Sequence, residues 1–224
     1  MQSLSAASVP GVILDLDAVL ILLSAFACLG SKLFDRYLAY YGTQSVLLAV
    51  AAGTVAFVEH SSALWILAVL TVLLKGLGIP LAARHLLVRR LQLKRDTGLA
   101  AGLSFSLIVG AALCTFAYLV TGQRTLAVGL VATAVVPLST AVVLLGALTM
   151  VVRRHPVAQL VGWLIMENGV FLGAIVLTAS FPFIVEAGIL LDVVAAVLIM
   201  LTMVSGLAQR LVDATTGKMR SLAE

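Results

Sequence analysis

Hydrophobic residues follow one another along this chain in long runs, without the short alternation of polar and apolar positions that is typical of a water-soluble fold. Charged and turn-forming residues separate seven such runs, which cover about residues 12–31, 38–58, 63–83, 99–121, 126–151, 157–179 and 183–207. Each run is close to the ~20 residues that an α-helix needs to cross the hydrocarbon layer of a bilayer. Lipid cannot satisfy an open strand edge, so runs of this length predict helices. The pattern therefore predicts an all-α integral membrane protein with seven transmembrane helices.

The composition supports the same fold class. Hydrophobic residues make up 62% of the 224 residues and charged residues only 11%, so most of the chain must lie in lipid. The formal net charge is +4, and basic loops at a membrane surface are a sufficient reason for it. The lipid bilayer is therefore an expected partner, and nucleic acid is not.

The positions of the basic residues predict how the helices are oriented. If seven helices alternate across the membrane, twelve of the fourteen Lys and Arg residues fall on one side, Arg124 falls on the other, and Lys75 lies inside a run. Basic loops are retained in the cytoplasm, so the N-terminus is predicted outside and the C-terminus inside the cell. Residues 1–10 contain no Lys or Arg, and the first run is expected to stay as a helix rather than be removed as a signal peptide.

The loop over residues 84–97 is the longest and most basic, and it divides the chain. The predicted regions are an N-terminal three-helix membrane region with the basic cytoplasmic loop (1–97), a fourth helix and connector (98–125), a three-helix module (126–210) and a cytoplasmic tail (211–224). The basic loop is either a topogenic signal alone or a face that binds anionic lipid headgroups.

Three ionisable residues lie in the middle of apolar runs. Glu167 lies in the sixth run and is followed by the amide Asn168, Asp192 lies in the seventh run, and Lys75 lies in the third. An ionisable group at the bilayer centre costs at least ~2.5 kcal/mol unless it faces partners or water inside a bundle. At 1.5 Å per residue from the outer helix ends, the three depths are roughly 20, 17 and 18 Å. Equal depth predicts that these side chains meet, and that Lys75 has an internal partner.

Two interpretations of this layer remain open. It is a buried polar cluster that fixes helix packing, or it is a proton relay. In lipid a carboxylate favours its protonated form, and a nearby ammonium favours the ionised form. Moving the ammonium would therefore switch the carboxylate between taking and releasing a proton. Glu186, about three residues into the seventh helix, is either an outer branch of this path or an ordinary interfacial residue.

Further positions stand out within the apolar runs. Pro137 lies in the middle of the fifth run, where it is expected to kink the helix; the kink fits either a helix that lines a hydrated path or ordinary helix packing. Asp15 and Asp17 are expected at the outer start of the first helix, where the helix dipole is sufficient to explain them. Gly169 and Gly173 form a small face that can pack a neighbouring helix while Glu167 points elsewhere. No His or Cys spacing indicates a metal site, so neither a metal nor another cofactor is expected.

The stretch from Arg153 to Gly162, RRHPVAQLVG, and the following IMENGVFL resemble the E component of hydrogenase-4-type complexes. The segment EAGILLD, from Glu186 to Asp192, fits the same pattern. Residues 126–210 are also similar to the K subunit of respiratory complex I and to the C subunit of Mrp-type antiporters. In the complex I subunit the acidic residue comes two positions after the Gly. Here Leu164 takes that place, and Glu167 follows one helical turn later.

This resemblance implies a small membrane subunit of a group 4 nickel-iron hydrogenase or formate hydrogenlyase assembly, in a bacterial or archaeal cytoplasmic membrane. Such a subunit is not catalytic and carries no cofactor. It links a redox arm to antiporter-like, proton-pumping subunits, and both would be its partners. The expected function is a lateral intramembrane proton path. The alternatives are a stand-alone small ion transporter or channel, and a purely structural membrane anchor.

Overall fold

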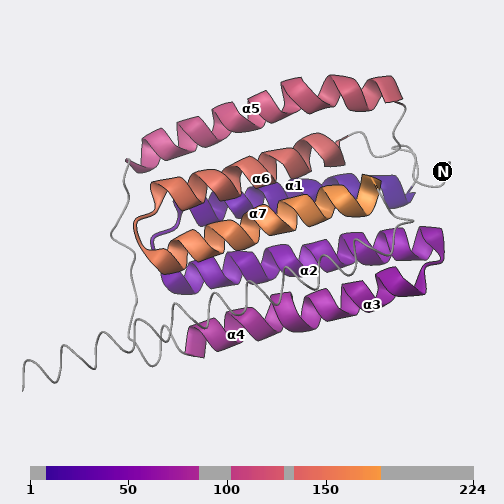
Figure 1. The fold of residues 1–224 in the computed structure, drawn as a ribbon, viewed down its shortest axis with the longest axis horizontal. Coiled ribbons are helices and arrows are strands. Elements are labelled where there is room, and N and C mark those ends of the chain that lie inside the picture. The colour runs from indigo at the N-terminus through magenta and orange to yellow at the C-terminus, as the bar shows by residue number, and fades with distance from the viewer. Residues whose placement is uncertain (1–8, 86–101, 129–133, 178–224) are drawn as a thin grey trace, which may run out of the picture.

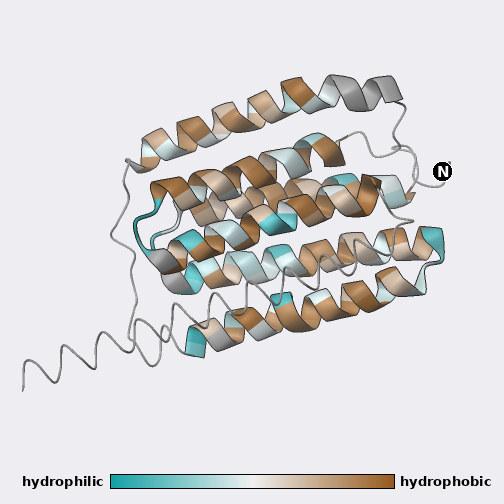
Figure 2. Cartoon of the chain, viewed as in Figure 1, coloured by the Kyte–Doolittle hydropathy of each residue, from teal (hydrophilic) through white to brown (hydrophobic). Residues whose placement is uncertain are grey.

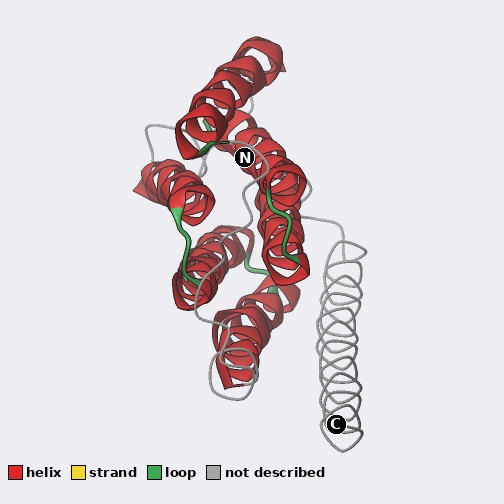
Figure 3. Cartoon of the chain, turned by 90° about the vertical axis from the view of Figure 1, so that its left-hand side faces the viewer, coloured by secondary structure: helices red, strands yellow, loops and turns green. Residues whose placement is uncertain are grey.

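The computed structural model describes residues 9–85, 102–128 and 134–177 (Figure 1). These ranges contain α1 (Val9–Gly30), α2 (Phe34–Glu59), α3 (Ser62–Thr71), the π-helical segment η2 (Val72–Gly78), α4 (Ile79–Ala83), α5 (Leu103–Val128), α6 (Val135–Val152) and α7 (Pro156–Leu177). α3, η2 and α4 follow one another without a loop. Figure 3, which looks along the helix axes, shows only helices and loops among the described residues.

Six helical stretches of the described residues are long and apolar enough to cross a membrane, which fits a multi-pass membrane protein. They correspond to the first six predicted runs, with ends shifted by several residues in places. The seventh run, 183–207, lies outside the described residues. The prediction of seven spans and the predicted orientation therefore stay predictions.

The helices lie side by side as a flat bundle (Figure 1). α5 forms one edge, α3 with α4 forms the opposite edge, and α1, α2, α6 and α7 lie between them. In Figure 2 most of the helical surface is hydrophobic. Large apolar side chains point outward on several helices, as at Ile108 and Val151, which are 69% and 77% exposed. Such a surface is costly in water and matches the acyl chains of a bilayer.

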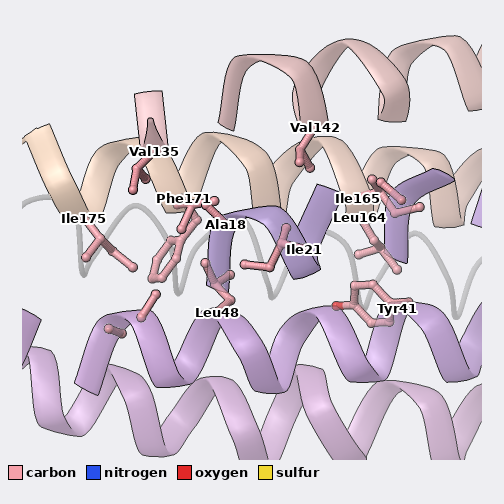
Figure 4. Close-up of a cluster of buried hydrophobic side chains, with 14 of the residues drawn as sticks. Ala18, Ile21, Tyr41, Leu48, Val135, Val142, Leu164, Ile165, Phe171 and Ile175 are labelled. Carbon is pink, nitrogen blue, oxygen red and sulfur yellow. The ribbon is translucent and has the colours of Figure 1, made fainter. Parts of the chain in front are cut away.

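The core lies between the four central helices. Ala18, Ile21, Leu48 and Phe171, from α1, α2 and α7, gather in one cluster (Figure 4). Buried small residues on α2, among them Ala51, allow the neighbouring backbones to approach. The core is therefore shared by the N-terminal helices and by the α6–α7 hairpin.

Glycines bring α6 and α7 into backbone contact. A Cβ added at Gly146 would lie 2.5 Å from the backbone nitrogen of Met166, and one at Gly169 would lie 2.8 Å from that of Val143. One at Gly173 would lie 2.8 Å from Ser139 Oγ. The predicted packing face at Gly169 and Gly173 is therefore confirmed, and small residues permit this close crossing as they do in membrane helix pairs.

The predicted position of Pro137 is wrong. α6 begins at Val135, so Pro137 lies in the first turn of the helix rather than in its middle. In the first turn a missing N–H removes no intrahelical hydrogen bond, and proline is tolerated there without a kink. Pro137 is buried in the bundle, and its place at a helix start gives no support to a kinked, water-lining helix.

Candidate functional site

The site begins at an irregular stretch of the third membrane helix. Over η2 the backbone widens to a π-helix, and the N–H of Ile79 donates to the carbonyl of Leu74, five residues back. Pro80 follows directly and has no N–H to offer to Gly76, its i−4 partner in a regular helix. Gly76 and Gly78 lower the helix propensity of the same stretch. Single π-turns of this kind often mark functional sites, and this one carries Lys75, which is 1% exposed.

Lys75 forms an ion pair with Glu167 on α7. Its Nζ lies 2.8 Å from Glu167 Oε1, and the two side chains are 1% and 4% exposed. Nζ also donates to Oδ1 of Asn168 at 3.3 Å. The pair joins residues 92 positions apart in the sequence. The predicted internal partner of Lys75 is thus Glu167, and these two members of the predicted layer do meet.

Asn168 extends the network to α2 and α1. Its Nδ2 donates to Gln44 Oε1 at 3.1 Å and to Ser45 Oγ at 3.4 Å. Gln44 in turn donates from Nε2 to the carbonyl of Ile21 at 3.2 Å, and Ser45 donates to the carbonyl of Tyr41 at 3.0 Å. All three polar side chains of α2 and α7 in this chain of contacts are fully buried. A connected buried layer therefore runs from η2 through α7 and α2 to α1.

Phe171, one turn beyond Glu167 on α7, covers the ammonium. The centre of its ring lies 5.6 Å from Lys75 Nζ, within the range at which an aromatic face attracts a cation. Phe171 also belongs to the hydrophobic cluster of Figure 4. The charged pair is thus closed off by apolar side chains on this side.

The electrostatics of the layer follow from this composition. A single buried charge costs several kcal/mol, and the cost falls when the opposite charge lies at hydrogen-bond distance. Lys75 and Glu167 cancel each other, while Asn168 supplies a neutral acceptor to the ammonium. The ammonium can give up a proton and the carboxylate can take one. The amides and the hydroxyl beside them can orient either charge state.

The remaining predicted site residues fall elsewhere. Asp192 and Glu186 lie outside the described residues, so the predicted meeting of Asp192 with the pair stays a prediction. Pro137 lies at the start of α6, apart from the hydrogen bonds of the Lys75 network. Lys75, Glu167 and Asn168 are therefore the three predicted residues that the structure brings together.

Gln44 and Ser45 were missed by the sequence reasoning. Their signal was present, because two polar residues stand side by side within the apolar run 38–58. Neutral polar residues are common in helices for packing reasons, so the run alone did not single them out. Only the fold places them against Asn168.

Arg153 is more than the ordinary basic loop residue that the sequence indicates. Its side chain is 1% exposed. Nη2 donates to the carbonyls of Leu29 and Ser31, both at 2.6 Å, and the guanidinium lies over the ring of Tyr37 at 5.1 Å. A cation is favourable at the carbonyl end of a helix. Arg153 therefore ties the end of α1 to the loop between α6 and α7.

The interpretation of Asp17 as a residue at the start of a helix is corrected as well. α1 begins at Val9, so Asp17 lies eight residues inside it, about 12 Å along the axis. The helix dipole acts within the first turn only. Asp17 is 4% exposed and points into the bundle with Ala18 and Ile21 beside it on the buried face. Its Oδ2 has no hydrogen-bond partner among the described residues.

Metal-ligating side chains do not cluster in the described ranges. No group of three or more His, Cys, Asp or Glu residues there could hold a metal ion. The buried layer contains one ammonium, one carboxylate, two amides and a hydroxyl, all of which donate or accept hydrogen bonds.

Comparison with known proteins finds a relative that matches part of the chain. The chain is 39% identical over 89 residues to the uncharacterized protein Rv0085 of Mycobacterium tuberculosis. The aligned part covers 40% of this chain and 40% of that protein. No protein-family model matches the chain, and no solved structure matches it either.

Proposed function

We propose that this chain is a non-catalytic membrane subunit of a complex I-like, group 4 hydrogenase-type assembly, in which it forms part of a lateral proton path within the membrane. The proposed partners are a redox arm and antiporter-like membrane subunits. The proposed location is a bacterial or archaeal cytoplasmic membrane. The motif resemblance in residues 153–192 supports the kind of assembly.

The observation that carries the proposal is the buried pair of Lys75 and Glu167 with its amide neighbours. An ammonium and a carboxylate at 2.8 Å form a site whose charge state depends on their separation. If Lys75 turns away, the carboxylate is left in apolar surroundings and favours the protonated form. Lys75 lies in a π-helical turn, a local irregularity of a kind that often occurs at functional sites. The pair therefore has the parts that a proton switch needs.

The direction of the path follows from where the network ends. It enters α7 at Glu167 and leaves through Asn168 and Gln44 toward α1. In the proposal, Asp192 also belongs to the path, and Glu186 is its outer branch. The chain then relays protons sideways between neighbouring subunits.

A structural anchor is the second candidate, and one observation favours it. The described network is densely hydrogen-bonded and covered by Phe171, as expected of a polar cluster that fixes helix packing. The third candidate, a stand-alone ion transporter or channel, predicts ion flux from the purified chain in liposomes. Co-purification with large hydrophilic redox subunits would contradict it.

The deciding experiment replaces the pair in the intact complex. The double variant Lys75→Met with Glu167→Leu substitutes apolar side chains of similar size, which often preserves stability. A relay predicts that this complex assembles and loses proton transfer. An anchor predicts that it assembles and transfers protons at the original rate. Replacing Glu167 and Asp192 by Gln and Asn gives the second test, because assembly with unchanged proton transfer in those variants rules out the relay.

A further inference from the structure

A second buried carboxylate lies near the proposed path and has no role in the pair. Asp17 on α1 is 4% exposed, and its Oδ2 is enclosed without a hydrogen-bond partner among the described residues. A buried ionised carboxylate without partners is strongly disfavoured, whereas its protonated form is tolerated in an apolar site. The position therefore favours a carboxylic acid that holds a proton.

Asp17 lies one helical turn from the end of the buried network. Ile21, whose carbonyl accepts the hydrogen bond from Gln44, follows Asp17 by four residues on the same buried face of α1. The two Cα atoms lie about 6 Å apart along the helix axis, and ordered water between the Asp17 carboxyl group and the Gln44 amide would complete the connection. Asp17 is thus placed next in line after Gln44.

Asp15 continues this line toward the end of the bundle. It is less buried than Asp17, and a backbone hydrogen bond joins it to Ala134. Ala134 is the residue directly before α6 and supplies no side-chain cap of its own. The carboxyl group of Asp15 therefore lies beside the N-terminus of α6. The distribution of basic residues predicts that this end of the bundle is the outer one.

The titratable groups around Asp17 are few. α6 contributes none between Val135 and Val152. Near Asp17, α2 contributes the apolar side chain of Leu48 and the neutral amide of Gln44. α5 contributes the partly buried thiol of Cys114. On α1 itself the neighbour is Asp15, and the opposite charge that the network reaches is Lys75, which is paired with Glu167. Neither α1 nor α6 carries a Lys or Arg, whereas α5 carries Arg124 near its end.

From this placement we infer that Asp17 is a proton-binding carboxylate that connects the Lys75–Glu167 pair, through Gln44 and Asn168, to the outer end of the bundle at Asp15. This inference rests on the proposed function, because it gives that path an outer branch along α1. This outer branch lies on the first helix and does not depend on Glu186 in the seventh predicted helix.

Chemical labelling of the full chain in lipid nanodiscs tests the proton on Asp17 directly. Dicyclohexylcarbodiimide adds to protonated carboxylic acids in apolar sites and leaves a stable acylurea, which mass spectrometry locates. Asp17 is expected to be labelled, and labelling is expected to fall as the pH rises. Asp35 is the internal control, because it is exposed and paired with Arg84 at 3.0 Å. Absence of label on Asp17 across the pH range in which the chain stays folded overturns the inference.

Variants of the intact complex test the branch. Asp17→Asn is expected to slow proton transfer on the order of a hundredfold, as for the loss of a positioned proton-transfer group, while Asp17→Glu keeps it. If Glu167→Gln stops transfer and Asp17→Asn leaves it unchanged, the inference about Asp17 is wrong and the proposed function stands. If both variants transfer protons normally, the inference about Asp17 and the proposed function are both wrong. If Asp17→Asn does not assemble, the labelling result and the Asp17→Glu variant decide.

Discussion

Nζ of Lys75 lies 2.8 Å from Oε1 of Glu167, and both side chains are almost completely buried. The two residues come from the opposite halves of the described chain, so their contact joins the N-terminal helices to the α6–α7 hairpin. Each charge makes the burial of the other possible.

Removing one partner of the pair is expected to destabilise the chain strongly. Glu167→Leu alone or Lys75→Met alone leaves a buried charge without its counter-charge, at a cost of about 3–5 kcal/mol. The double variant is expected to recover most of that loss, since it removes both charges. Unfolding of the purified chain in detergent mixtures, followed by circular dichroism, measures the difference. A double variant as unstable as the sum of the single variants would contradict this coupling.

Asn168 is expected to stabilise the fold through its hydrogen bonds to buried polar side chains. Asn168→Leu keeps the approximate volume but removes the donor to Gln44 Oε1 and one acceptor of Lys75. An unsatisfied buried polar group costs about 1–3 kcal/mol. The same unfolding measurement tests it, and Thr54→Val is the control, because Thr54 is only half-buried and its side chain bonds to Val50 in its own helix. Equal effects of the two substitutions would show that the Asn168 contacts are unimportant for stability.

Gly146→Ala is expected to push α6 and α7 apart. The new methyl carbon would lie 2.5 Å from the backbone nitrogen of Met166, and neither backbone can move without separating the helices. A loss of about 1–3 kcal/mol is expected for such overpacking. Gly53→Ala is the control, because there the nearest atom is 3.6 Å away and belongs to the Trp65 ring. That control is expected to be neutral, or stabilising by up to about 1 kcal/mol from helix propensity.

Arg153→Met is expected to loosen one end of the bundle. The substitution removes both hydrogen bonds to the carbonyls of Leu29 and Ser31, and a hydrogen bond to a charged group contributes about 1.5–3 kcal/mol. Backbone amides near these carbonyls should therefore exchange faster in hydrogen-exchange mass spectrometry. Arg154→Met, at the neighbouring exposed position, should leave the exchange unchanged. Equal exchange in both variants would reduce Arg153 to an ordinary basic loop residue.

The helical class and the meeting of Lys75 with Glu167 followed from the sequence because both depend on one strong constraint. Lipid forces long apolar runs into helices, and a charge inside such a run must find a partner at its own depth. The depth of a residue in the membrane follows from its number along the helix. The sequence alone was therefore enough to predict that Lys75 and Glu167 meet.

Rotation about the helix axis and the position of helix starts were harder to predict. Gln44 and Ser45 became part of the site only because their face of α2 meets Asn168. The hydrophobic run places Asp17 at a helix start, whereas the first helix begins earlier, at Val9. Pro137 was misplaced because α6 starts at Val135, later than its run. A run that is apolar on every side has no periodic pattern from which the rotation of the helix or its first residue could be predicted.

The 92-residue separation of Lys75 and Glu167 has a consequence for biosynthesis. The third span leaves the ribosome with its ammonium long before the carboxylate of α7 has been made. A lone Lys at mid-membrane raises the cost of insertion by about 2.5–3.5 kcal/mol, so the third span is more stable in lipid once α7 has supplied the carboxylate. The ion pair therefore favours an order of assembly in which the third span settles last against α7.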